Sequence, residues 1–177
     1  MSDAEASTTA ERIRRAALSR FATFGYGSTT MEDIATDAGV GVATLYRRWP
    51  DKPSLADSLL DHVLTDFEVI VVPAQGGSPK RRFVSLVERL WRFASDDPDR
   101  FIFLEDSVHA PYISAETATR KDLLTSAGAA LLRDAGVRAD EAIAHAMVIG
   151  TMTALLRARA DVDPTDLADR LWSALRT

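Results

Sequence analysis

The sequence predicts an all-α protein of about nine helices, and three observations support this fold class. Apolar residues recur with the 3.6-residue period of a helix in almost every segment. No segment shows convincing strand alternation. Glycine and proline stand between the periodic segments, where helices begin and end. The chain has 177 residues, a length that suits one domain or two small ones sharing a continuous core.

The first two helices follow from apolar faces and end signals. Glycines in the run 25–27 end the first helix, and Gly39 ends the second, because glycine accepts the left-handed conformation. Thr29 or Thr30 caps the second helix, with Glu32 or Asp33 three residues on making a capping-box pattern. The apolar faces consist of Ile13, Ala17, Phe21 and Phe24 in the first helix, and of Met31, Ile34, Ala35 and Ala38 in the second.

A third short helix covers about Val42 to Arg48, and Pro50 blocks its continuation. Asp51 caps a fourth helix, which has Pro53 in its first turn and runs over about 53–71. A loop is predicted at 73–79, "PAQGGSP". The remaining helices are expected at about 80–95, 98–109, 114–134, 139–160 and 164–176. Residues 1–52 thus form a small three-helix domain, and residues 53–177 form a larger bundle, which the fourth helix links to it.

Composition narrows the class of protein. The chain has no cysteine, which excludes disulfides, thiolate zinc sites and cysteine nucleophiles. Its first residues lack the apolar core of a signal peptide, and no uncharged apolar run approaches the roughly 20 residues of a membrane helix. We therefore expect a soluble, cytoplasmic protein without a membrane partner. The net charge of −5 argues against indiscriminate nucleic-acid binding, although a local basic patch remains compatible with binding.

The predicted third helix separates into two faces. Val42, Leu45 and Trp49 are spaced three and four apart and are expected to point into the small bundle. On the other face, the methyl group of Ala43 suits a thymine methyl and Arg47 suits a guanine edge. The residues suited to phosphate oxygens are Thr44, Tyr46, Arg48 and Lys52. Two short helices joined by a glycine turn describe a helix-turn-helix; the alternative is that these arginines are ordinary solvated charges.

Residues 21–60 resemble the DNA-binding region of the TetR (tetracycline-repressor-like) family of transcriptional regulators. The resemblance rests on the order and spacing of short motifs over about the first third of the chain. These are Phe24-Gly25-Tyr26, Thr29-Thr30, Ile34-Ala35, Ala38-Gly39-Val40, Thr44-Leu45-Tyr46, Trp49 and Lys52.

The resemblance implies a role for each matching position. Thr30 would cap the second helix and bond a phosphate, and Arg47 and Arg48 would lie at the groove. Thr44, Tyr46 and Lys52 would contact the DNA backbone. Two positions depart from the family pattern: Gly41 stands where many members have a capping serine, and Ala43 replaces a common glycine.

The DNA-binding segment is not strongly basic. Between Met1 and Leu60 there are seven Lys or Arg and eight Asp or Glu residues, a formal charge of −1. Few phosphate contacts per subunit are therefore available, and we expect a homodimer on a palindromic operator. Its recognition helices would stand about 34–36 Å apart, in successive major grooves.

A stripe of small residues is the best dimer signal. Relatives in the resembled family pair their last two long helices into a four-helix interface. The alternative is that the stripe packs inside its own subunit. The stripe consists of Ala142, Ala146, Gly150 and Ala154, flanked by Ile149 and Leu156.

A mostly apolar set of side chains, with a few polar handles, is the candidate lining of a small-molecule site. The alternative is ordinary core packing. The set contains Trp91, Phe101, Phe103, His109, Tyr112, Met147 and Thr151.

Two other functions are compatible with parts of the sequence. The pairs Glu105/His109 and Glu141/His145 contain the residue types of carboxylate-bridged metal enzymes, but such bundles use a Glu-x-x-His spacing that is absent here. No nucleophile elbow, phosphate loop or dinucleotide fingerprint occurs, so we expect no enzyme, metal or cofactor. A regulator that responds to a protein partner is the second alternative. The sequence favours a homodimeric repressor that responds to a small-molecule effector.

Overall fold

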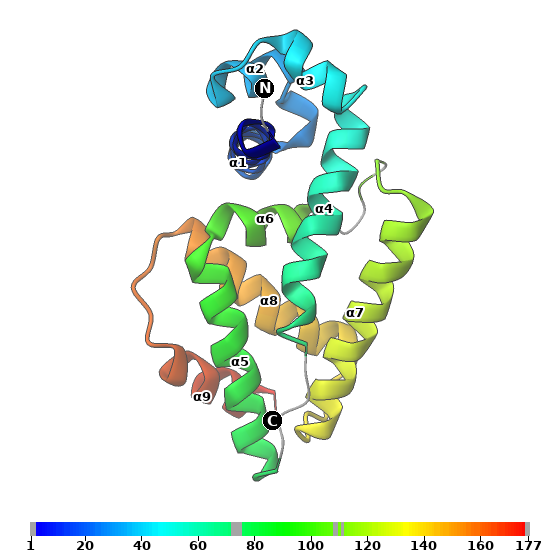
Figure 1. Ribbon diagram of the computed structural model, residues 1–177. Coiled ribbons are helices and arrows are strands. Elements are labelled where there is room, and N and C mark those ends of the chain that lie inside the picture. The colour runs from blue at the N-terminus through cyan, green and yellow to red at the C-terminus, as the bar shows by residue number, and fades with distance from the viewer. Residues whose placement is uncertain (1–2, 72–75, 108–109, 111, 176–177) are drawn as a thin grey trace. The chain divides into compact units, whose positions relative to one another are not determined.

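The computed structural model describes residues 3–71, 76–107, 110 and 112–175, and these residues form nine α-helices with no strand among them (Figure 1). The predicted all-α fold is therefore confirmed. The helices are α1 Asp3–Ser28, α2 Met31–Ala38, α3 Val42–Arg48, α4 Lys52–Glu68, α5 Pro79–Asp96, α6 Pro98–Asp106, α7 Ala115–Asp134, α8 Glu141–Arg157 and α9 Pro164–Ala174.

The first helix differs from the prediction at its end. Its backbone breaks at Gly25, with φ 79° and ψ 159°, and helical hydrogen bonding then resumes as far as Ser28. Only glycine adopts this region without strain. Phe24, predicted on the buried face, is 59% exposed instead. It lies in the turn just before the break, where the other described helices leave it uncovered, and the Arg20 guanidinium lies 5.3 Å from its ring centroid.

By packing, the chain divides into two compact units. One, which we call the head unit, consists of Met1–Leu64 and Asp99–Ala118. The other, the body unit, consists of Thr65–Pro98 and Thr119–Thr177. Helix α4 contributes residues to both units. The functional domains 1–52 and 53–177 remain a prediction.

The core of the head unit forms where α1, α2 and α3 meet. Ile13, Ile34 and Leu45, one from each helix, are fully buried, and Figure 1 shows the three helices as a small bundle. Helix α6 belongs to the same unit, since the Phe103 ring stacks on Phe21 with 5.6 Å between centroids. Burial of large side chains of this kind, at about 1.5–3 kcal/mol each, is what stabilises such short helices.

The core of the body unit rests on the packing of α5 against α9. The rings of Phe83 and Trp172 lie 5.3 Å apart at its centre. Ser78 and Asp163 cap the two helices through their side chains, and a proline occupies the first turn of each. The capping residues explain why both helices begin where the sequence predicted, within one residue.

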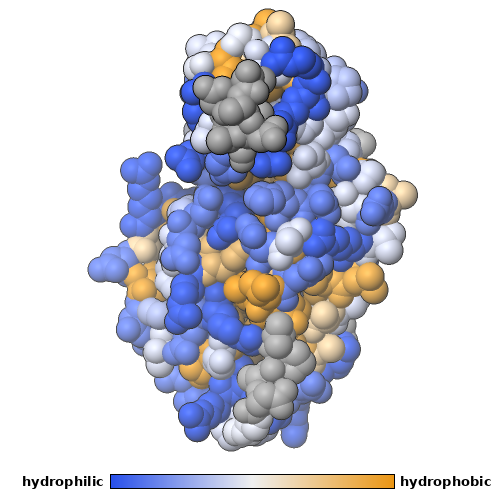
Figure 2. Space-filling model, viewed as in Figure 1, coloured by the Kyte–Doolittle hydropathy of each residue, from blue (hydrophilic) through white to orange (hydrophobic). Residues whose placement is uncertain are grey.

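Most of the face shown in Figure 2 is hydrophilic, and hydrophobic atoms emerge between the polar groups in small patches. Among the described residues, no helix combines the length and apolar character that crossing a bilayer requires. The large hydrophobic side chains with the highest exposure are Phe24, Val42, Tyr46, Val69, Leu123 and Ile143.

Glu105 in α6 provides a test of the head-unit packing. Burial raises the pKa of its carboxyl from 4.5 to about 7, and the nearby Asp106 carboxylate adds to the rise. Between these two pH values the folded protein holds a proton that the unfolded chain has released, so stability falls as the pH rises through this window. We expect Glu105→Gln, which stays neutral, to be more stable than the parent at pH 8 by roughly 1–3 kcal/mol.

Urea unfolding followed by circular dichroism at pH 5 and pH 8 would measure this difference, which should shrink at pH 5. Asp122→Asn, an exposed carboxylate on α7, is the matched control and should behave alike at both pH values. An equal loss of stability in Glu105→Gln at both pH values would show that the ionised carboxylate has a stabilising partner.

Candidate nucleic-acid interface

Helix α3 is held by two side chains and presents the others to solvent. Leu45 is fully buried and Trp49, at the C-terminal end, is 6% exposed. Val42 was predicted to join them, and this was wrong, because it is 40% exposed. It lies in the first turn of α3, directly after the residue Gly41 that precedes the helix.

The outward face of α3 has the predicted open character. Ala43, Tyr46, Arg47 and Arg48 are exposed, and Thr44 is partly buried. The Arg48 guanidinium lies 5.4 Å from the Trp49 ring centroid. No described residue forms a hydrogen bond or ion pair with Arg47, so its five N–H donors are available to an external acceptor. The face can therefore offer a methyl group, a phenol and two guanidiniums to a surface.

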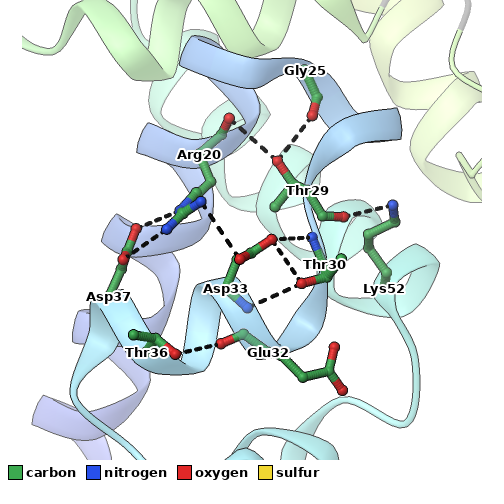
Figure 3. A network of polar contacts seen from close by, with 9 residues as sticks. All are labelled: Arg20, Gly25, Thr29, Thr30, Glu32, Asp33, Thr36, Asp37 and Lys52. Atoms are coloured by element: carbon green, nitrogen blue, oxygen red, sulfur yellow. Dashed lines mark hydrogen bonds and ion pairs between the residues drawn. The ribbon is translucent and has the colours of Figure 1, made fainter.

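Helix α2 is fixed at both ends by the expected signals. Of the two candidate caps, Thr30 is the N-cap: its Oγ1 accepts a hydrogen bond from the Asp33 amide at 3.1 Å. The Asp33 carboxylate accepts in return from the Thr30 amide, at 3.1 Å, and from its hydroxyl, at 2.7 Å (Figure 3). Gly39 ends the helix in the left-handed conformation, with φ 63° and ψ 41°. Gly41 precedes α3 without a side-chain cap, as its lack of a hydroxyl predicts.

Two arginines of α1 connect it to α2. Arg12 donates through Nε to the Ala38 carbonyl at 3.0 Å and through a terminal nitrogen to the Gly39 carbonyl at 2.9 Å. These are helix-end carbonyls without a partner in α2, and a cation there also complements the helix dipole. The contact thus stabilises the turn between α2 and α3.

Arg20 forms the second connection. Its guanidinium contacts both carboxylate oxygens of Asp37, one at 2.9 Å, and lies 3.7 Å from Asp33 (Figure 3). The hydrogen bond from Arg20 lowers the pKa of Asp37, and the hydrogen bonds from Thr30 lower that of Asp33. Both carboxylates are therefore ionised at neutral pH, which keeps the network intact.

Sequence reasoning missed these roles of Arg12 and Arg20. It counted both as basic charge of the DNA-binding segment. Their partners lie on or at the end of another helix, some 13 to 27 positions along the chain, and no local motif identifies contacts at that separation.

Lys52, predicted to contact phosphate, is bonded inside the head unit. Its Nζ donates to the carbonyls of Tyr26 and Thr29, each at 2.8 Å. The Thr30 hydroxyl, also assigned to phosphate, donates to Asp33. Arg14 also pairs with Glu11, at 3.7 Å. Together with Arg12, Arg20 and Lys52, this makes four of the seven basic side chains before residue 60 that are engaged within the unit. Arg15, Arg47 and Arg48 have no hydrogen bond or ion pair to another described residue.

The predicted ligand residues are divided between the two units. Phe101, Phe103 and Tyr112 belong to the head unit, where Phe103 and Tyr112 stack on residues of α1. Trp91, Met147 and Thr151 belong to the body unit, on α5 and α8, which pack against each other. Trp91 is 7% exposed and the other two are partly buried. His109 lies outside the described residues.

The predicted dimer stripe is exposed on α8, with one exception. Ala146, Gly150 and Ala154 are solvent-exposed, whereas Ile149 is 6% exposed and packs within the body unit. The side chains of Ala142 and Glu141 lie outside the described residues. Exposed Ile143, 55% accessible, extends the same side of the helix.

A metal centre is not assembled by the described part of the chain, in which no three His, Cys, Asp or Glu side chains gather. Of the two Glu-x-x-x-His pairs, one includes His109 and the other includes the Glu141 side chain, both outside the described residues. Partial desolvation lowers the pKa of His145.

Comparison with known proteins finds a family model that matches the segment containing these helices. The sequence model of the bacterial regulatory proteins of the tetR family matches residues 13–59, the segment that contains α2 and α3. An uncharacterized HTH-type transcriptional regulator of Mycobacterium tuberculosis is 29% identical over 167 residues, which cover 92% of this chain and 85% of the relative. A regulator described in the same words from Mycobacterium bovis is 29% identical over 168 residues, with the same coverage.

Solved structures share the fold over the whole chain. A tetR-family regulatory protein from Rhodococcus RHA1 superposes with a TM-score of 0.74, covering 99% of this chain and 97% of the other, at 20% identity. A TetR-family regulator from Marinobacter aquaeolei VT8 gives a TM-score of 0.72, covering 98% of each chain, at 18% identity. Residues 13–59 match the TetR family model, and the chain as a whole is similar to TetR-family transcriptional regulators in sequence and fold. The relatives found in this way are DNA-binding transcriptional regulators.

Proposed function

We propose that this protein binds a palindromic operator as a homodimer, with α3 in the major groove, and that a small-molecule effector releases it from DNA. The observation that carries the proposal is the outward face of α3. Ala43, Arg47 and Arg48 are open to solvent while Leu45 and Trp49 hold the helix from behind. Arg47, unpaired among the described residues, is the side chain suited to the bidentate contact with a guanine edge.

Charge supports the dimeric part of the proposal. The segment to Leu60 has a formal charge of −1, and four of its seven cations are engaged internally. One head offers few phosphate contacts, so its affinity alone is low. TetR-family regulators act as dimers. The exposed side of α8, with Ala146, Gly150 and Ala154, suits a second copy because small side chains allow helices to approach closely.

The effector part rests on the body unit. Trp91, Met147 and Thr151 bring an aromatic ring, a thioether and a hydroxyl to the packed pair α5 and α8. In a dimer, an effector can prefer a conformation in which the two α3 helices are poorly spaced for the operator. It then lowers operator affinity by the difference between its binding free energies for the two conformations. A protein that occupies a promoter in this way acts as a repressor, and it does so in the bacterial cytoplasm, where its DNA lies.

Replacement of Arg47 tests the reading face. We expect Arg47→Ala to weaken operator binding by about 1–3 kcal/mol and to relax the preference at one base position of each half-site. The operator would first be selected from random DNA, and selection would be repeated with the variant. Arg15→Ala, another exposed arginine without a described partner but on α1, should leave base preference unchanged. An Arg47→Ala protein with the parent's affinity and preference would refute the assignment.

A charge on the exposed side of α8 tests the dimer. We expect Ala146→Glu to sediment as a monomer at concentrations where the parent is dimeric, because two buried carboxylates would face each other across the axis. Operator affinity should fall with it. Ser95→Glu, at another exposed position near the end of α5, is the control. A dimer that survives Ala146→Glu would place the interface elsewhere.

Titration of small molecules tests effector response. Tryptophan fluorescence would report binding, and each bound compound would be added to the operator complex. We expect an effector to lower operator affinity about 5- to 150-fold, and the operator to lower effector affinity by the same factor. If operator affinity is indifferent to every compound that binds, the effector part of the proposal fails and the partner-responsive alternative gains.

A further inference from the structure

The Lys52 ammonium is enclosed by partners within the head unit. Nζ lies 2.8 Å from the Tyr26 carbonyl oxygen, 2.8 Å from the Thr29 carbonyl oxygen and 4.3 Å from the centroid of the Tyr26 ring. An ammonium has three N–H donors. Two are used by the carbonyls, and the ring face stabilises the remaining positive charge. Figure 3 shows the Lys52 side chain reaching the Thr29 carbonyl.

The two carbonyls belong to the short connection that leads into α2. The chain leaves regular helix geometry at Gly25, and the hydroxyl of Thr29 bonds back to the Gly25 carbonyl at 2.9 Å. Thr30, the next residue, is the N-cap of α2. Lys52 is the first residue of α4, immediately beyond α3.

The hydrogen bonds of Lys52 therefore connect the residues just before α2 to the residue just after α3. Thr29 and Tyr26 lie 23 and 26 positions before Lys52 in the chain. Lys52 sets where the segment begins relative to where it ends, and with it the direction in which α3 projects.

Tyr26 is itself held from a distant part of the chain. Its ring stacks on Tyr112, with centroids 4.1 Å apart and an interplanar angle of 29°. The Ser107 hydroxyl donates to the Phe103 carbonyl at 2.7 Å and lies 2.8 Å from the Tyr112 hydroxyl. All of these residues belong to the head unit. The ring beneath the Lys52 ammonium is thereby fixed in place.

We propose that Lys52 is a positioning residue for operator recognition and does not neutralise a DNA phosphate. This inference rests on the proposed binding of DNA by α3 and assigns Lys52 a role different from the one that the family resemblance implies. Two of the three N–H donors of the ammonium are engaged by these carbonyls, and a part-buried Thr29 carbonyl that lost this donor would be unfavourable. Arg47 and Arg48 have no such commitment.

Salt dependence distinguishes the two roles. A phosphate contact releases counterions, so losing it flattens the slope of log Kobs against log salt concentration by about 0.9 for each Lys52. A positioning residue leaves that slope unchanged and lowers affinity at every salt concentration. We expect Lys52→Met to weaken binding to the selected operator at least tenfold with an unchanged slope. Arg48→Met is the calibrating variant, because its exposed guanidinium should contribute to the slope.

The measurement is fluorescence anisotropy with labelled operator over 50–300 mM KCl. A slope for Lys52→Met that falls as in Arg48→Met would overturn the proposal. If Lys52→Met does not fold, Lys52→Gln replaces it, since a neutral amide keeps N–H donors for the carbonyls. Positioning then predicts the parent slope, and phosphate contact predicts the flattened one.

Hydrogen exchange provides a readout without DNA. We expect the amides of residues 26–31 to exchange faster in the folded Lys52 variant than in the parent, with α5 and α9 unchanged as internal controls. Equal exchange rates at residues 26–31 would overturn the proposal. A parent protein that binds no operator would refute the proposed function, and the exchange experiment would still decide whether Lys52 holds the connection.

Discussion

Burial of Leu45 beneath α3 is the constraint on which the recognition surface depends. A helix of seven residues has no stability of its own in water, because too few hydrogen bonds offset the cost of nucleation. Leu45 and Trp49 provide the missing stabilisation through packing, and they fix the rotation of the helix at the same time. Once these two side chains point inward, Ala43, Arg47 and Arg48 must point outward. Anchoring and recognition are thus two consequences of one orientation.

Most basic side chains of the head unit form contacts within the unit itself. Arg12, Arg20 and Lys52 each bridge positions that are distant in the chain, and each satisfies carbonyl or carboxylate oxygens at a helix end. A short-helix domain has little apolar surface to bury, so charge-assisted hydrogen bonds contribute a larger share of its specificity. The consequence is a DNA-binding unit with few uncommitted cations, which favours recognition by geometry over non-specific attraction.

The sequence left two alternatives to a regulator that responds to a small molecule: a metal enzyme and a regulator that responds to a protein partner. Similarity to transcriptional regulators favours a regulatory role over the enzyme alternative. Regulation by a protein partner competes directly with regulation by a small molecule. The small-molecule reading draws on Trp91, Met147 and Thr151 of the body unit, whereas Phe103 and Tyr112 pack within the head unit and connect α6 and the segment after it to α1. Those two aromatic residues therefore have a structural role that does not require any ligand.

Local signals in the sequence determined the helices, the caps of α2 and the exposed face of α3, because the apolar period, the Thr30–Asp33 pair and Gly39 act within one or two turns. The periodicity of α3 was enough to place Leu45 and Trp49 inside, but not to show that Val42 lies beyond the cover of its neighbours. The tertiary structure alone decided that Lys52 bonds to the carbonyls before α2, that Arg12 and Arg20 tie α1 to α2, and that Tyr112 stacks on Tyr26. These contacts join residues from 13 to 86 positions apart in the chain, and only the packing of helices against one another brings such positions together.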